Sequence, residues 1–164
     1  MIWDVEVHQA GEKGLGVFAL RAFAPGEFIF RRRHGRRVQN QEIATLSTVD
    51  QMHLCELDAD TSAIIQPPGC FLNHCCRPNA MRSGVKVFAW SSISMGEEVT
   101  IDYRLNATGE DLWECSCGHC PGRIVGSFFG LDADTQGLYL PFAPLFITSE
   151  HRRRSSAKST ARAQ

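Results

Sequence analysis

The stretch Phe71-Leu72-Asn73-His74-Cys75-Cys76-Arg77-Pro78-Asn79 gathers an amide, an imidazole and two adjacent thiols within nine residues. Amide and imidazole groups donate and accept hydrogen bonds, and thiolates bind zinc. These groups suit a ligand-binding site. In the alternative, structural interpretation, Asn73 and His74 only form hydrogen bonds with buried backbone groups of a loop. Three further motifs lie before and after this stretch, and the order of all four along the chain indicates the fold. They are Gly14-Leu15-Gly16, Gly96-Glu97-Glu98-Val99-Thr100-Ile101-Asp102-Tyr103 and Cys115-Ser116-Cys117-Gly118-His119-Cys120.

In this order the motifs resemble a SET domain followed by a post-SET cysteine cluster, over roughly residues 4–130. That family transfers methyl groups from S-adenosylmethionine to protein lysines. The resemblance implies a mainly β fold with short helices, built from several small sheets with a knot-like C-terminal threading and a post-SET zinc loop. We expect a SET domain over residues 1–108, a post-SET zinc segment over 109–130, a C-terminal docking segment over 131–150 and a disordered basic tail over 151–164.

The composition suits one globular domain, with 164 residues of which 43% are hydrophobic. No apolar run approaches the roughly 18 residues that a membrane-spanning helix needs. The N-terminal segment also lacks the basic start and apolar stretch of a signal peptide. We therefore expect an intracellular protein, cytoplasmic or, in a eukaryote, nuclear, without a membrane partner. In such a compartment the seven cysteines favour thiols or metal ligands over disulfides.

Charge is distributed unevenly along the chain. Residues 1–150 contain 12 lysines and arginines against 18 aspartates and glutamates, whereas residues 151–164 add five positive charges. An acidic body suits a basic peptide substrate, although ordinary solubility explains it equally well. Five arginines lie within residues 31–37, where they would either bind nucleic acid or form a solvated loop, and we favour the loop. Beside a substrate channel they would repel a basic, histone-like tail.

Alternating apolar and polar residues predict several short strands, over residues 3–8, 17–20, 27–30, 85–90 and 99–103. A flexible loop is expected over residues 10–16, and a short helix over 39–50. In the last strand, Val99, Ile101 and Tyr103 share one face. The apolar, proline-punctuated segment 137–147 is expected to cover the domain as a short helix or an extended segment.

The resemblance implies that S-adenosylmethionine binds at Lys13, Gly14, Leu15, Gly16, Asn73, His74, Tyr103 and Trp113. The two glycines would let the backbone pass close to a ligand because neither carries a Cβ, but a simple hairpin turn uses the same pair. Trp113 would cover the adenine, and core packing explains it equally well. Cys75 replaces the serine that the family usually has, and a thiol is the weaker hydrogen-bond partner.

The cysteine motif supplies three thiolates, one fewer than a structural zinc site needs. The resemblance implies that Cys76 completes a set with Cys115, Cys117 and Cys120, and that the zinc clamps the C-terminal segment across the cofactor loop. The family usually places four residues between its last two cysteines, and here only two separate them. His119 or Cys75 would be substitute ligands, and unpaired thiols without metal are the alternative.

Methyl transfer needs an unprotonated amine, whereas free lysine has a pKa of about 10.4. A dry channel lowers that pKa, and positioning supplies much of the remaining catalysis. The resemblance assigns the catalytic hydroxyl to Tyr103, one of only two tyrosines. We therefore predict S-adenosylmethionine-dependent methyl transfer to the ε-amine of a lysine in a protein substrate. The alternatives are a catalytically silent SET-like module that binds protein or nucleic acid through its arginines, and a plain zinc-stabilised interaction domain.

Overall fold

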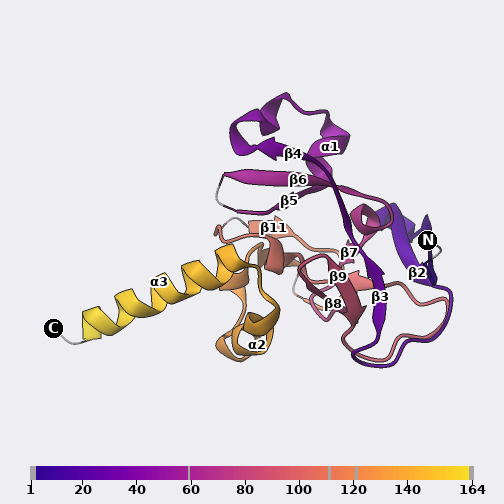
Figure 1. Ribbon diagram of the computed structural model, residues 1–164. Helices are drawn as coiled ribbons and strands as arrows, with labels where there is room; N and C mark the ends of the chain where they lie inside the picture. The colour runs from indigo at the N-terminus through magenta and orange to yellow at the C-terminus, as the bar shows by residue number, and fades with distance from the viewer. Residues whose placement is uncertain (1–2, 59, 111, 121, 163–164) are drawn as a thin grey trace.

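Five small β-sheets, rather than one large sheet, form the described part of the chain (Figure 1). The computed structural model describes residues 3–58, 60–110, 112–120 and 122–162, with side chains as far as residue 157. Turns divide the chain into short strands, and the longest strand among these residues has seven. The expected mainly β fold of several small sheets with short helices is confirmed.

The N-terminal sheet is an antiparallel hairpin of β1 (Val5–Gln9) and β2 (Leu15–Ala19). A short 3₁₀ helix, Gly11–Lys13, connects the two strands where we expected a flexible loop. Gly14 ends this helix with a φ of 77°, a conformation that glycine adopts without strain. The hairpin thereby carries Lys13 and the glycine motif at its turn.

The second sheet packs against the larger hydrophobic core. Its strands β3 (Phe28–Arg31), β9 (Lys86–Ala89) and β8 (Ala80–Ser83) are antiparallel neighbours in that order. Phe30 and Val87 from this sheet belong to one buried cluster with Val17 of β2, and all three are fully buried. The core therefore joins the hairpin to the second sheet.

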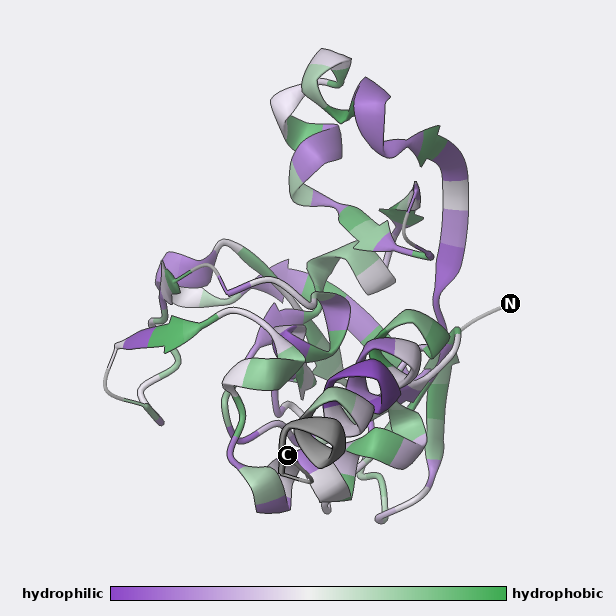
Figure 2. Cartoon of the chain, turned by 90° about the vertical axis from the view of Figure 1, so that its left-hand side faces the viewer, coloured by the Kyte–Doolittle hydropathy of each residue, from purple (hydrophilic) through white to green (hydrophobic). Residues whose placement is uncertain are grey.

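The third sheet forms a lobe at the top of Figure 1, with the strand order β4 (Arg33–Gln39), β6 (Thr61–Gln66) and β5 (Leu54–Glu56). A 3₁₀ helix, Asn40–Thr45, and α1 (Thr48–Met52) occupy the segment where one short helix was expected. The solvated loop that we favoured over residues 31–37 is wrong. Most of this segment belongs to β4, the long hydrophilic strand leading to the lobe in Figure 2, because pairing with β6 satisfies its backbone.

The fourth sheet is short, with β7 (Asn73–His74) parallel to β10 (Thr100–Ile101). The strand predicted over residues 99–103 ends early because Asp102 caps a 3₁₀ helix, Tyr103–Asn106. The Arg104 backbone N–H donates to Asp102 Oδ1 at 3.0 Å. Tyr103 therefore begins a helix instead of sharing a strand face with Ile101.

The fifth sheet is an antiparallel hairpin of β11 (Leu112–Glu114) and β12 (Arg123–Val125), and its connection holds the cysteine motif. After it come α2 (Ala133–Tyr139), a 3₁₀ helix Leu140–Phe142 and α3 (Leu145–Arg162). Tyr139 and Ile147 are buried in a second core with Phe128. The segment 137–147 thus covers the domain, as expected.

The disorder expected from residue 151 onward is wrong as far as Arg162, because α3 continues to that residue (Figure 1). Glu150 accepts hydrogen bonds from Arg153 and Arg154, one helical turn further on. The Arg154 guanidinium also lies 3.9 Å from the ring centroid of Phe129. These contacts stabilise a helix that the polar composition did not predict. No helix among the described residues is long and apolar enough to cross a membrane.

Protonation of Glu150 is expected to loosen α3. Hydrogen bonds from Arg153 and Arg154 lower the pKa of Glu150 to about 2 from an ordinary 4.5. A carboxyl with a lowered pKa stabilises the fold above its unfolded-state pKa, and this contribution disappears as pH falls toward the folded-state value. Hydrogen exchange over residues 145–157, corrected for intrinsic rates, should therefore quicken as pH falls from about 4.5 to 2. Glu150→Gln should show the faster exchange at neutral pH, and unchanged rates would contradict the assignment.

Candidate functional site

Tyr103 lies where the segments singled out by the sequence meet. Its backbone N–H donates to His74 Nδ1 at 3.1 Å, and its hydroxyl donates to the carbonyl of Leu72. The neighbouring Asp102 side chain is fully buried and binds the Arg104 guanidinium at 2.7 and 2.9 Å. The chain is therefore held on both sides of Tyr103, which orients the ring.

A cavity of about 150 Å³ borders Tyr103. Gly14, Leu15 and Gly16 lie beside this cavity and do not line it. The Leu15 carbonyl accepts a hydrogen bond from Asn73 Nδ2 at 3.1 Å. The structure thus brings five of the eight predicted cofactor residues together, and their cofactor role stays a prediction. These five wall residues are Lys13, Asn73, His74, Tyr103 and Trp113.

Glu98 links two of the residues in the cavity wall. Its carboxylate pairs with Lys13 Nζ and accepts a hydrogen bond from Asn73 Nδ2 at 2.7 Å. Gly16 makes room for Glu98, because a Cβ at Gly16 would lie 2.8 Å from Glu98 Oε1 and 2.8 Å from Ala10 Cβ. The second glycine of the motif therefore serves packing against Glu98.

Gly16→Ala is expected to destabilise the fold by about 1–3 kcal/mol, because the added methyl group overlaps atoms that have little room to move. The matched control is Gly137→Ala in α2, where a Cβ meets nothing within 4 Å and the backbone is helical. That change should be neutral or stabilise the protein by roughly 0.5–1 kcal/mol. Urea unfolding of the three proteins measures both effects. Equal stability of the two variants would refute the packing role of Gly16.

The wall residues fit part of an S-adenosylmethionine molecule. Trp113 Nε1 is buried without a hydrogen-bond partner among the described residues, so it is a donor for a ligand acceptor. The carboxylate, hydroxyls and purine of this cofactor all offer acceptors. The cavity is smaller than the roughly 300–1,000 Å³ of most ligand sites, so it holds only part of the molecule.

His74 connects the Tyr103 segment to the cysteines. Burial lowers the pKa of His74, with Asp102 opposing the shift and Arg104 adding to it, so the imidazole is neutral at neutral pH. Because Nδ1 accepts from the Tyr103 N–H, the proton resides on Nε2, which lies 3.2 Å from Cys76 Sγ. The imidazole therefore bridges the two groups of residues.

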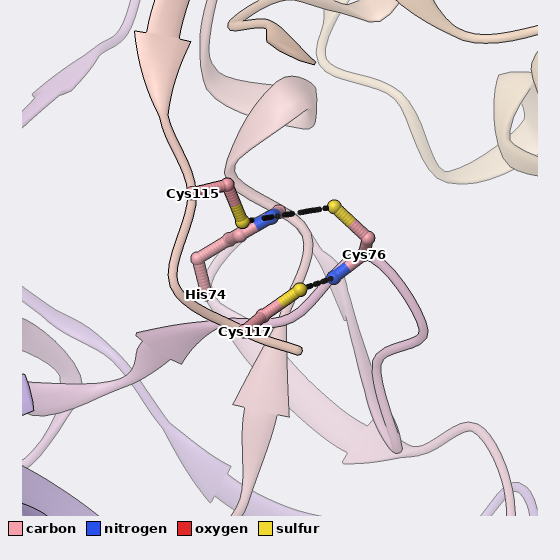
Figure 3. A group of neighbouring side chains, drawn as sticks. All are labelled: His74, Cys76, Cys115 and Cys117. Atoms are coloured by element: carbon pink, nitrogen blue, oxygen red, sulfur yellow. Dashed lines mark hydrogen bonds between the residues drawn. The ribbon is translucent and has the colours of Figure 1, made fainter. Parts of the chain in front are cut away.

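The ligand atoms of His74, Cys76, Cys115 and Cys117 all lie within 4.8 Å of one another (Figure 3). Cys120 joins them through Cys117, at an Sγ–Sγ distance of 3.9 Å. The sulfurs of Cys76 and Cys115 are also 3.9 Å apart. A tetrahedron with Zn–S bonds of about 2.3 Å has edges of about 3.8 Å. Three of the four predicted ligands, Cys76, Cys115 and Cys117, thus suit a zinc ion in donor chemistry and spacing, with His74 as the fourth member of the group, and the role of Cys120 stays a prediction.

The thiols of this cluster differ in acidity. Burial raises the pKa of Cys115 to about 11. Burial acts on Cys117 in the same direction, but N–H donors from Cys76 and His119 outweigh it and lower the pKa of Cys117 to about 6. A Cys117 thiolate thus lies beside a protonated Cys115, and a zinc ion that binds there would release the Cys115 proton.

A second cavity of about 150 Å³ also borders Tyr103, and of the described residues only Tyr103 lines both cavities. Arg32 lines the second cavity and is only 5% exposed. Its Nε and NH1 atoms have no hydrogen-bond partner among the described residues. The second cavity contains no carboxylate among its described wall residues, so its wall is cationic.

Glu98, Asp102 and Arg32 are residues of the site that the sequence did not predict. Glu98 and Asp102 lie inside the motif over residues 96–103, so their position in the sequence indicated the site. A glutamate or an aspartate taken alone did not. Arg32 gave no such indication, because an arginine in a basic run is normally solvated. Its burial depends on Gly69, where a Cβ would lie 2.9 Å from Arg32 Cγ.

Comparison with protein families now identifies the fold. A family model described as the SET domain matches residues 14–104, which include Asn73, His74 and Tyr103. The chain belongs to the SET domain family. The earlier resemblance is therefore confirmed, on a match that covers more than half of the chain.

The SET chain is similar to curated histone-lysine N-methyltransferases described as H3 lysine-36 specific. The Kluyveromyces lactis protein is 32% identical over 75% of this chain and 20% of its own length. The Mus musculus protein is 29% identical over 74% of this chain and 5% of its own length. The SET chain thus spans a fifth or less of these two relatives.

A solved structure shows the same fold. It is the methyltransferase domain of the human histone-lysine N-methyltransferase SETMAR, which has a TM-score of 0.56 and 23% identity to the SET chain. The match covers 74% of this chain and 58% of the solved one. At this level of identity the likeness concerns the fold.

Proposed function

We propose that the SET chain transfers a methyl group from S-adenosylmethionine to the ε-amine of a lysine in a protein substrate. The observation that carries the proposal is that Tyr103 lines both cavities, alone among the residues that the structure describes. A methyl donor on the side of Lys13 and Asn73, and an amine on the side of Arg32, would meet at the Tyr103 side chain. Family membership supports the same reaction.

When bound, S-adenosylmethionine supplies an electrophilic methyl carbon, to which the amine nitrogen bonds as the carbon–sulfur bond breaks. The residues of the chain orient the reactants and exclude water, which contributes much of the rate. Asn73 and Lys13 would bind the polar end of the cofactor, and Trp113 would cover its base. The Trp113 ring centroid lies 5.0 Å from His74 and 5.8 Å from Tyr103, so these rings form one aromatic wall.

Tyr103 would take part as a neutral hydroxyl. Burial raises the pKa of Tyr103 to about 12, although Arg32 opposes the shift. A raised pKa favours the protonated form of an acid, so Tyr103 is no phenolate base near neutral pH. Because its O–H donates to the Leu72 carbonyl, the oxygen lone pairs are available to accept an N–H of the entering amine.

The acceptor side favours a neutral amine. Lysine has a pKa of about 10.4 in water and has to lose a proton before it attacks. Arg32 is buried, and its cation would repel a lysine ammonium group. The burial of the cavity wall would also disfavour the charged ammonium form. Both effects would lower the pKa of a lysine that enters.

Histones are the first protein substrates to test, since the named relatives are H3 lysine-36 specific enzymes. The acidic balance of residues 1–150 supports a basic partner. The exposed side chains of Arg31, Arg33 and Arg36 oppose a basic segment that approaches along β3 and β4. Lysines with acidic neighbours are therefore useful additional substrates.

We also propose a structural zinc bound by Cys76, Cys115, Cys117 and Cys120. This ion would join the segment after β7 to the loop after β11. Residues 113–117 line the cofactor cavity, so the zinc would hold that wall in place. Removal of zinc should then weaken cofactor binding.

Calorimetric titration of S-adenosylmethionine into the zinc-loaded protein tests the cofactor site. We expect saturable binding to the wild-type protein and at least tenfold weaker binding to Asn73→Ala, because Asn73 lines the cavity. Folding of the variant is checked by its unfolding transition. A folded, zinc-containing wild-type protein that does not bind the cofactor would sink the proposed function.

Tyr103→Phe should reduce methyl transfer by roughly 10²–10³-fold, in the range for loss of one preorganised polar contact. Radiolabelled methyl transfer to histones and to a lysine-rich peptide library measures the rate. The control is Tyr139→Phe, which removes a hydroxyl from the second core, because Tyr139 lines neither cavity. Equal losses in the two variants would mean that the Tyr103 hydroxyl contributes only to stability.

A catalytically silent SET-like module remains the second candidate. The observation that favours it is the exposed arginine run, which includes Arg36 and Arg37 on β4. Such a surface suits an acidic protein or a nucleic acid. The two candidates differ in the calorimetric titration, because a silent module without a cofactor would give no saturable binding.

A further inference from the structure

The two departures of this chain from the family pattern meet at one place in the structure. Cys75 replaces the usual serine, and the shortened final gap of the cysteine motif contains His119. These two residues are 44 positions apart in the chain, yet Cys75 Sγ lies 3.5 Å from His119 Nδ1. Neither residue belongs to the proposed four-cysteine zinc site.

Cys75, Cys117 and His119 form a ligand group of their own. Their ligand atoms lie within 4.8 Å of one another, a spacing that suits direct coordination of one ion. Cys75 is 7% exposed, which shields a bound ion from solvent on that side. Cys117 also belongs to the first group, with Cys76 and Cys115. One sulfur is thus common to the two groups.

The His119 ring turns its Nδ1 toward the other two residues of this group. Its Nδ1 lies 2.8 Å from the Cys117 carbonyl, which can only accept, so Nδ1 carries the proton. Coordination through Nδ1, the nitrogen that faces Cys75 Sγ at 3.5 Å, would move this proton to Nε2 and break the contact with the Cys117 carbonyl.

We infer that the chain binds a second zinc ion through Cys75, Cys117 and His119, with the Cys117 sulfur bridging it to the first ion. On binding, the Cys75 thiol releases its proton to solvent, and its sulfur becomes the third protein ligand of the ion. Three protein ligands leave one position of a tetrahedron for water or another small ligand. The second ion also reduces the net charge of the cluster from −2 to −1, because it brings two positive charges and only one additional thiolate.

The second ion would lie beside the cavity that we propose for the cofactor. Ser116 and Cys117 line that cavity, and Cys75 follows directly after His74 in β7. A second ion would therefore tie the end of β7 to the cysteine loop at a second point. This inference concerns metal binding alone and stands whether or not the chain transfers methyl groups.

The test is the zinc content of the full chain after saturation with zinc and removal of unbound metal, measured by elemental mass spectrometry. We expect two zinc ions per wild-type chain and one in Cys75→Ser and in His119→Ala. The matched control is Cys70→Ser, a cysteine outside both groups, which should keep two. One zinc per wild-type chain would overturn the inference, whether or not any variant folds. Two in Cys75→Ser or in His119→Ala would also overturn it.

Substitution with cobalt tests the shared sulfur. A thiolate bridge couples the spins of two Co²⁺ ions, so the paramagnetic resonance signal of the first ion should decrease as the second equivalent binds. In Cys75→Ser the signal should reach its maximum at one equivalent and then stay constant. A wild-type signal that keeps growing to two equivalents would mean that the ions are separate and would overturn the bridge.

Discussion

The parallel pairing of β7 with β10 is the constraint on which the rest of the site depends. It consists of only two residue pairs, Asn73 with Thr100 and Ile101 with His74. Parallel strands need a long connection, and here residues 75–99 supply it. Because these strands lie side by side, the His74 ring accepts the Tyr103 N–H, and the Leu72 carbonyl receives the Tyr103 hydroxyl. Predicted cofactor residues and the proposed catalytic residue are thereby brought into one wall.

Buried charges secure this arrangement. Asp102 lies next to Tyr103, and its side chain is fully buried but paired with Arg104 through a bidentate contact. Such pairing offsets much of the free energy needed to remove the carboxylate from water. Arg32 presents the opposite case, since two of its nitrogens have no partner among the described residues. The protein therefore carries an uncompensated positive charge beside the cavity where we propose that the amine binds.

The cysteine cluster acts on the site from the C-terminal side. Cys115 and Cys117 are proposed zinc ligands and line the cavity proposed for the cofactor, so an ion bound there would also constrain the shape of that cavity. His74 contacts both the cavity wall and the cysteines. Its Nδ1 accepts the Tyr103 N–H, and its Nε2 lies beside Cys76 Sγ. An ion at the cysteines would thus stabilise the wall that Trp113 and Tyr103 form.

The sequence by itself determined the family, the mainly β class and most residues of the candidate site. Short motifs with fixed spacing encode these features, because local backbone geometry and ligand chemistry need particular residue types at particular positions. Only the tertiary structure decided that Arg32 is buried, that Tyr103 begins a helix, that α3 continues past residue 151 and that Cys75 meets His119. Each of these depends on contacts between segments or on a helix cap, and a composition or a period along the chain does not contain that information.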